Sequence, residues 1–460
     1  MANATHAATG DAADGATRAG SAAPFVPGGG ATVPPASVPL SFLAAGGVGL
    51  WALGLAVWFA ADRLVHTPAH PGAVAAVHVG VLAFLTTAVL GAAHQFAPVV
   101  ARRRLRSVTA ARLTLVGMLA TAWLLPSGFA HGPESLIAAG AVTGSLTVLL
   151  AAWNLSGPLS ARDGGVPLVG LRWSIGFLVA TVAFGAVYAF NRHAAWFPLL
   201  PNRVMAHAHL GLLGWLGLTY VAVAEKLWPM FLLAHRPRAR SGAWAVRLLA
   251  VGVPFLAAGL LFAVPLLAWP GAAASAAGLA AHLTSLAGAV RHRRRPLELL
   301  HGFLFVSVGF LVAGVALGAA AALADVDLAD RSRLVAAEVA ALVAWLGLAV
   351  VGHAHKIVPF IGYSALRARG VSTSPSGRPL LFGDLFHPGV ARATLGTASS
   401  GFVLAIAGIL STSTALVALG GVGISLTGLL STLNLAIGPV RVLRRHAAAD
   451  APAPTAAALR

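Results

Sequence analysis

Long apolar runs dominate this sequence and limit its fold more than any other feature. Mostly apolar stretches of about 20 residues recur along the whole chain, separated by short segments rich in Pro, Gly or Arg. A helix of that length spans the hydrocarbon core of a bilayer. Of the 460 residues, 58% are hydrophobic and only 10% are charged, and a soluble domain has no means of burying so much apolar surface. The sequence therefore predicts an all-α, polytopic membrane protein.

We expect twelve transmembrane helices, counted from the apolar runs. They are predicted at residues 38–61, 74–99, 112–131, 136–157, 171–191, 205–232, 246–268, 271–290, 297–324, 334–361, 392–411 and 414–440. Residues 37–442 then form a single transmembrane domain. Residues 1–36 and 443–460 are rich in small residues without an apolar period, which is typical of disordered tails.

Arginine is distributed unequally between the two sides of this predicted bundle. The clusters ARRRLR, HRPRAR, RHRRR and VLRR fall in loops on the side of the N-terminus. Loops on the other side contain only Arg63, Arg192, Arg203, Arg331 and Arg333. This asymmetry predicts that both termini are cytoplasmic, in a membrane of the bacterial inner (cytoplasmic) type. The formal charge of +18 has the same origin, so we expect the lipid bilayer and not nucleic acid as the partner.

Histidine is the main source of cofactor ligands. The chain has 17 histidines and no cysteine, which excludes disulfides, iron–sulfur clusters and thiolate metal sites. It also lacks the Cys-x-x-Cys-His motif of covalently attached haem. Any electrons would therefore come from a partner subunit, a cytochrome or a quinone.

The second, sixth and tenth predicted helices are copies of one another. Their sequences are HVGVLAFLTTAVLGAAHQFAP, HLGLLGWLGLTYVAVAEKLWP and VAALVAWLGLAVVGHAHKIVP. They end at Pro98, Pro229 and Pro359, so the copies are spaced by 131 and 130 residues (229 − 98 and 359 − 229). We expect these prolines to kink or end their helices.

Two further features of the copies repeat at fixed positions. An aromatic residue precedes a leucine at Phe84, Trp215 and Trp345, which favours packing over a cofactor role. The fourth and third positions before the proline are occupied by His94 and Gln95, Glu225 and Lys226, and His355 and Lys356. The two lysines are the only ones in the chain.

A second set of copies lies in the fourth, eighth and twelfth helices. The run SLTVLLAAWNL from Ser145 matches SLTGLLSTLNL from Ser425, and HLTSLAGAVRH from His282 matches more loosely. Repeats at a fixed period indicate repeated structure. The sequence therefore predicts three four-helix arcs around a pseudo-threefold axis.

Two His-x-His pairs occur, His207/His209 and His353/His355. Successive helix residues are about 100° apart, so the two imidazoles of each pair point to opposite faces and to different neighbours. Depth also restricts which histidines could bind one metal ion together. His78 and His209 occupy one repeat position, whereas His94 lies sixteen residues after His78, about 24 Å further in.

Because two imidazoles that bind one metal must bring their nitrogens to the same point, depth favours an outer pair, His78–His209, and an inner pair, His94–His355.

This arrangement resembles subunit I of the haem–copper oxygen and nitric oxide reductases, which has twelve helices in three arcs and histidines on helices two, six and ten. In that family, a second-helix histidine and the tenth-helix pair serve two haems, and sixth- and seventh-helix histidines hold copper. The resemblance implies haem at His78, His353 and His355, a sixth-helix ligand at His207 or His209, and a redox role with oxygen or nitric oxide. The predicted seventh helix contains no histidine, so the copper pattern is incomplete.

Together, the candidate cofactor ligands are His78, His94, His209, His353 and His355. His207 and His282 are candidate metal ligands, with a helix–helix hydrogen bond as the alternative for His282. Glu225, Lys226 and Lys356 are candidates for a proton path or for partners of haem propionates, and snorkelling to the interface is the alternative for the lysines.

Two other functions stay open at this point. One is a histidine-lined transporter or metal-handling permease, although twelve-helix carriers are usually two repeats of six. The other is a non-catalytic haem-binding sensor or assembly subunit.

Overall fold

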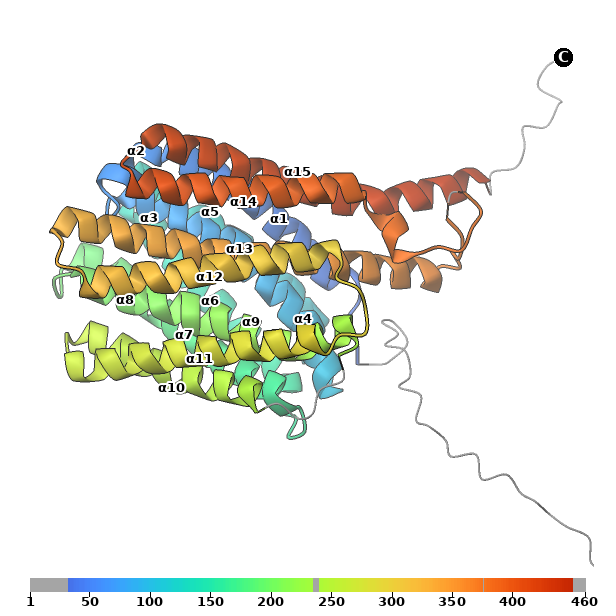
Figure 1. The fold of residues 1–460 in the computed structure, drawn as a ribbon, viewed down its shortest axis with the longest axis horizontal. Coiled ribbons are helices and arrows are strands. Elements are labelled where there is room, and N and C mark those ends of the chain that lie inside the picture. The colour runs from blue at the N-terminus through green and yellow to red at the C-terminus, as the bar shows by residue number, and fades with distance from the viewer. Residues whose placement is uncertain (1–31, 235–239, 375, 450–460) are drawn as a thin grey trace, which may run out of the picture.

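The chain forms a bundle of long helices. The computed structural model describes residues 32–234, 240–374 and 376–449, so most of the two predicted tails lies outside the described residues. Within these ranges, twelve helices are long and apolar enough to cross a membrane, and this confirms the predicted number. The helices lie nearly parallel (Figure 1). The end of the bundle where the first helix begins and the last one ends is called the termini side below, and the opposite end is called the far side.

The elements follow the predicted spans closely. The spans are α1 (Ser37–Phe59), α3 (Pro71–His78) with η1 (Val79–Thr86) and α4 (Thr87–Ala101), α5 (Val108–His131), α6 (Glu134–Leu159), α7 (Gly165–Ala194), α8 (Pro201–His209) with η2 (Leu210–Gly217) and α9 (Leu218–Leu232), α10 (Ser241–Leu261), α11 (Pro265–Arg291), α12 (Leu299–Leu323), α13 (Leu328–Ala368), α14 (Pro388–Leu410) and α15 (Thr414–Ala449). The short elements α2 (Ala61–His66) and η3 (Phe382–Leu385) belong to connections.

Several predicted helix boundaries differ from the structure, including those of the seventh, eighth, tenth and twelfth helices. The break between the seventh and eighth helices was expected at the sequence AWPG, but it lies at residues 262–264, and Pro270 is inside α11. Pro265 takes the first position of α11, where proline is favoured because its missing N–H would have no helical partner. At the other end of the chain, α15 continues to Ala449, past the expected boundary at residue 442.

The repeated prolines lie near the ends of two helices and inside the third. Pro98 and Pro229 precede the last residues of α4 and α9 by less than one turn, whereas α13 continues past Pro359 to Ala368. The residues that cap α4 and α9, Arg102 and Leu233, are both left-handed, with φ of 53° and 47°. The first two copies therefore end in the same backbone conformation.

Neighbouring helices pack mainly as antiparallel pairs. The pairs are α5 with α6, α10 with α11, α12 with α13 and α14 with α15, and α1 packs on η1 and α4. The last span also packs along the first, because α15 contacts α1. Figure 1 shows α14 and α15 lying along one edge of the bundle.

The second, sixth and tenth spans form the centre of the bundle. In their most apolar stretches, 56%, 72% and 67% of residues are buried, compared with 22–50% in the other nine described spans. The three repeated aromatic side chains, Phe84, Trp215 and Trp345, are at most 2% exposed. The aromatic repeat therefore packs the centre, as its sequence pattern favoured.

These aromatic residues contact one another's helices in a cycle. Each aromatic ring contacts a residue of another copy, and in all three contacts this residue follows that copy's own repeated aromatic by two positions. Trp215 Nε1 donates a hydrogen bond to Thr86 Oγ1 over 3.2 Å. Trp345 lies against Gly217 and Phe84 lies against Gly347, where an added Cβ would be 3.3 Å and 3.1 Å from the rings.

The sequence repeat of the fourth and twelfth helices places an equivalent asparagine near the end of each. Asn154 Oδ1 accepts the backbone N–H of Ser107 over 2.9 Å, and Asn434 Oδ1 accepts that of His387 over 2.7 Å. Ser107 and His387 are the N-cap residues of α5 and α14. The same bond thus links α6 to the start of α5 and α15 to the start of α14.

The second and sixth spans share a feature that the sequence pattern does not indicate. Both contain an eight-residue π-helical segment, η1 and η2, directly after His78 and His209. The segments begin 131 residues apart (210 − 79), the same spacing as that of the sequence copies. Such segments often occur at functional sites.

Candidate cofactor site of buried histidines

Five histidines hold one ring nitrogen in the same way. In each, Nδ1 lies 2.7–2.9 Å from the carbonyl oxygen four residues earlier; they are His78, His94, His209, His353 and His355. A carbonyl only accepts, so Nδ1 carries the hydrogen. A bond of this kind orients a histidine whose other nitrogen binds a metal. The five are the predicted cofactor ligands, and exposed His292 makes the same bond.

Three of these histidines leave Nε2 without a partner. The Nε2 atoms of His94, His353 and His355 are buried and accept no hydrogen bond, and the residues are 0%, 8% and 5% exposed. Buried polar atoms almost always have a partner. A lone pair held at a fixed orientation in an apolar interior is the donor that an iron porphyrin requires. These residues therefore fit haem.

His94 and His355 lie in equivalent surroundings. His94 stacks on Phe42 of α1 with ring centroids 5.6 Å apart, and His355 stacks on Phe303 of α12 at 5.4 Å. Both the histidines and the phenylalanines are 261 residues apart (355 − 94 and 303 − 42). Each histidine faces the first helix of its own repeat, so the structure gives no ring contact between the two in the described residues.

The tenth-span His-x-His pair contacts two different neighbours. His353 faces the sixth span, with Tyr220 and Phe231 at 6.0 Å and 6.2 Å between ring centroids. His355 faces Phe303 and lies edge-on to Phe386. The predicted division of the two imidazoles between opposite faces is confirmed.

The sixth-span pair on the far side behaves in the same way. His207 packs against α7, with its ring centroid 6.0 Å from that of Tyr188. His209 points to α13, where its Nε2 is 3.6 Å from Glu338 Oε1. His78 instead stacks on Phe129 of α5. The structure thus places His78 and His209 against different helices and gives no contact between them in the described ranges.

Glu338, to which the sequence interpretation assigned no role, lies against His209. Its side chain is 11% exposed, and that of His209 is 13% exposed. Because Nδ1 of His209 donates to the Met205 carbonyl, a proton must lie between Nε2 and the carboxylate for the contact to be attractive. Glu338 is the sole acidic residue in the predicted span 334–361, and a carboxylate inside a span is costly and usually functional. A single acidic residue within a predicted span was therefore the sequence signal that could have identified Glu338.

Polar side chains also gather between the sixth, eighth and tenth spans, and we call Tyr220, Glu225, His282 and His353 the inner polar cluster. Glu225 Oε1 is 3.7 Å from His282 Nδ1, and its Oε2 accepts a hydrogen bond from Ser285 over 2.7 Å. The Tyr220 ring lies 5.6 Å from that of His282. The hydrogen bond proposed for His282 is therefore replaced by a longer contact with Glu225.

Several atoms of the inner polar cluster lack hydrogen bonds. They are Glu225 Oε1, His353 Nε2 and both ring nitrogens of His282, which is fully buried. So many unsatisfied polar atoms in one region indicate a place for water, an ion or a cofactor.

The two lysines occupy different surroundings on the termini side. Lys356 Nζ donates to Glu298 Oε2 over 2.5 Å, and Glu298 is the N-cap residue of α12. Both side chains are partly exposed, so the pair adds little stability. Lys226 is exposed, as snorkelling predicts.

The described residues do not form a multi-histidine metal centre. No three His, Cys, Asp or Glu side chains among them lie close enough to hold a metal ion. His207 is on the far side against α7, whereas His282 belongs to the inner polar cluster. The copper centre that the resemblance implies therefore does not fit these residues, and no role is derived for it.

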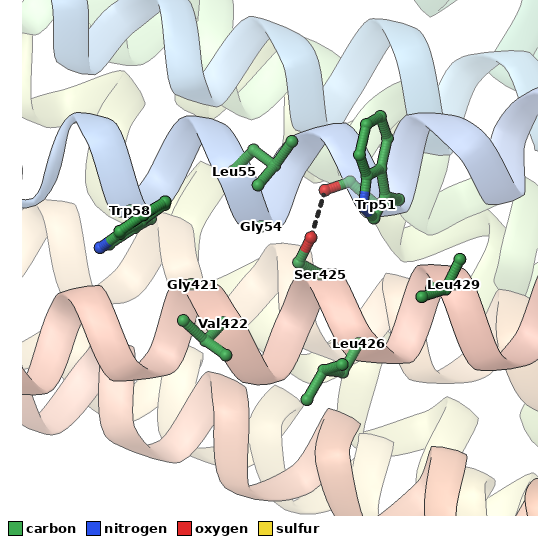
Figure 2. Close-up of a pocket in the computed structure, with 9 residues that line it drawn as sticks. All are labelled: Trp51, Gly54, Leu55, Trp58, Gly421, Val422, Ser425, Leu426 and Leu429. Atoms are coloured by element: carbon green, nitrogen blue, oxygen red, sulfur yellow. Dashed lines mark hydrogen bonds between the residues drawn. The ribbon is translucent and has the colours of Figure 1, made fainter.

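Two grooves lie on the surface of the bundle. Figure 2 shows one of about 170 Å³, where α1 and α15 meet at Gly54 and Gly421 and Ser425 Oγ donates to the Trp51 carbonyl over 3.0 Å. The other, of about 430 Å³, lies on the far side between α7, α8 and α10. No histidine lines either groove.

The chain matches none of the protein-family models compared with it. No curated protein sequence is significantly similar to it.

Proposed function

We propose that this integral membrane protein binds haem and has a redox or gas-related role like that of subunit I of the haem–copper oxygen and nitric oxide reductases. One observation carries the proposal. His94, His353 and His355 each donate Nδ1–H to the backbone and hold Nε2 buried and unpartnered. That geometry suits axial ligation of iron.

The termini-side histidines are better candidates than the far-side ones. Nε2 of His209 is already opposed by Glu338, so ligation there would first require this carboxylate to move. His94, His353 and His355 have no such competitor. When bound, haem would supply an iron that exchanges one electron or takes up oxygen or nitric oxide. The protein would orient it and keep water away.

We infer that the twelve spans form three four-helix units around a pseudo-threefold axis. The cyclic contacts of Phe84, Trp215 and Trp345 with the other copies support this arrangement. The matching surroundings of His94 and His355 support it independently.

The inner polar cluster is proposed to hold and pass protons. Glu225 is bonded to Ser285 and close to His282, and Tyr220 lies between His282 and His353. Lys356 already binds one carboxylate, that of Glu298. A haem propionate is the same kind of group, so Lys356 and Lys226 are proposed as its partners.

We place the chain in a membrane of the bacterial inner type, with both termini cytoplasmic, because of its arginine distribution. Its electrons would come from a partner subunit, a cytochrome or a quinone.

The test is the optical spectrum of protein purified from haem-replete cells, with haem per chain measured as the pyridine complex. We expect a Soret band that shifts on reduction. His353→Phe and His355→Phe should each lower haem per chain by at least about half, because one axial ligand is lost. His292→Phe is the matched control, since His292 makes the same backbone bond but is exposed.

Absence of a Soret band, or full haem content in the His94, His353 and His355 variants, would contradict the proposal. Haem-free protein that carries Zn²⁺ or Cu⁺ into vesicles would support the permease instead. Haem without oxygen or nitric oxide consumption would identify a sensor or assembly subunit.

A further inference from the structure

The far-side groove lies on the surface of the bundle between α7, α8 and α10. Phe184 and Val187 of α7 form one wall, and Leu261 and Phe262 at the end of α10 form the other. Its volume of about 430 Å³ is that of a small-molecule site. Asn202 Nδ2 donates to the Leu260 carbonyl over 2.8 Å and so fastens the start of α8 to the end of α10.

The walls of this groove face lipid. Val187 is 44% exposed and Phe262 is 69% exposed. Both belong to or adjoin helices that are long and apolar enough to cross a bilayer. An acyl chain is the material that meets such a surface, because apolar side chains there gain nothing from water.

A cation lies at the rim. The Arg203 guanidinium lines the groove and lies 5.3 Å from the Phe197 ring centroid. Its Nη1 donates to the Pro198 carbonyl, and Tyr188 Oη donates to the carbonyl of Arg203 itself. Among the described residues, no carboxylate lies within 4.0 Å of this guanidinium. A guanidinium has five donors, so several remain for an anion.

We propose that this groove binds an anionic phospholipid. Its phosphate pairs with Arg203, and one acyl chain lies between Val187 and Phe262. The positive charge of Arg203 favours an anionic occupant. Its guanidinium can donate two hydrogen bonds to two oxygens of one phosphate, whereas a neutral quinone head has no negative charge to pair with it. The inference is independent of haem, so either proposal can fail alone.

The chain supplies a matched control. Arg192, in the last turn of α7, lies over the Phe129 ring at 5.6 Å, so it is also a far-side arginine on an aromatic face. Arg192 does not line the groove. Arg203→Gln and Arg192→Gln therefore remove the same charge, and only one of them removes it from the proposed site.

In the experiment, full-length wild type, Arg203→Gln and Arg192→Gln are incubated in detergent with equal amounts of phosphatidylglycerol and phosphatidylcholine, reisolated, and assayed for lipid per chain by mass spectrometry. We expect wild type and Arg192→Gln to retain phosphatidylglycerol preferentially. Arg203→Gln should retain about tenfold less, the effect of losing one charge-assisted hydrogen bond.

A salt titration of wild type needs no variant, and a second variant tests the acyl-chain position. Raising NaCl from about 0.05 M to about 0.5 M should release phosphatidylglycerol from wild type, because the pair is screened. Val187→Trp should reduce retention of both lipids by filling the groove. Equal retention of the two lipids by wild type, unchanged retention in Arg203→Gln, salt-insensitive binding, or a quinone extracted in place of phosphatidylglycerol would overturn the proposal.

Discussion

At the scale of single residues, one backbone bond decides what each buried histidine offers. The bond from Nδ1 to the carbonyl four residues earlier turns the ring so that Nε2 points away from its own helix. Whether Nε2 is free to bind a ligand then depends on the residue that it faces. For His209 it is the Glu338 carboxylate, and for His355 the described structure provides no hydrogen-bond partner.

The equivalent asparagines of α6 and α15, Asn154 and Asn434, differ by one hydrogen bond, and this difference is measurable. Asn434 both accepts from His387 N–H and donates to its carbonyl, whereas Nδ2 of Asn154 has no partner. Asn434→Ala should lower the free energy of unfolding by about 1 kcal/mol more than Asn154→Ala. Denaturation in mixed micelles measures both. Equal losses would show that the second bond contributes nothing.

The sequence identified the candidate residues but not their partners. Repeat positions in the sequence selected His78, His94, His209, His353 and His355 and predicted their relative depth. Pairing depends on the direction of each ring around its helix axis relative to helices far away in the sequence. Thus His94 stacks on Phe42, and Glu338 was overlooked although it meets His209.

At the scale of elements, the lengths of the apolar runs predicted every span, but the sequence did not predict the local backbone geometry. Nothing in the sequences after His78 and His209 marks the π-helical segments, which contain no proline. The α10–α11 break was misplaced because both Pro265 and Pro270 are helix-boundary signals, and only packing decides between them. Composition identifies helices more reliably than it identifies their interruptions.

Close approach of helices depends on particular glycines. A Cβ at Gly352 would lie 2.7 Å from Phe303 Cβ, whereas a Cβ at Gly309 of α12 would have no atom within 4 Å. Gly352→Ala should therefore destabilise the protein by about 1–3 kcal/mol through overpacking. Gly309→Ala should be neutral or stabilising, by up to about 1 kcal/mol. Thermal unfolding in detergent compares them, and identical melting temperatures would contradict this account of the α12–α13 contact.

At the scale of the whole molecule, the bundle has a filled centre. Phe84, Trp215 and Trp345 occupy the place where the three inner spans meet, and each is at most 2% exposed. A route for ions or electrons would therefore bypass these three side chains, past residues such as Glu225 and His282. On the termini side, Arg103 and Arg106 of one arginine-rich loop donate hydrogen bonds to Ser160 and Ser156.

The orientation of this bundle can be measured directly, because the chain contains no cysteine and each introduced thiol is the only one. Thr67 and Ser411 are exposed on the far side, and Ser160 and Ser372 are exposed on the termini side. Arginine-rich loops stay in the cytoplasm. A membrane-impermeant maleimide should therefore label Thr67→Cys and Ser411→Cys in intact cells, and Ser160→Cys and Ser372→Cys only after permeabilisation. The reverse pattern would invert the bundle and place the Arg203 groove in the cytoplasmic leaflet.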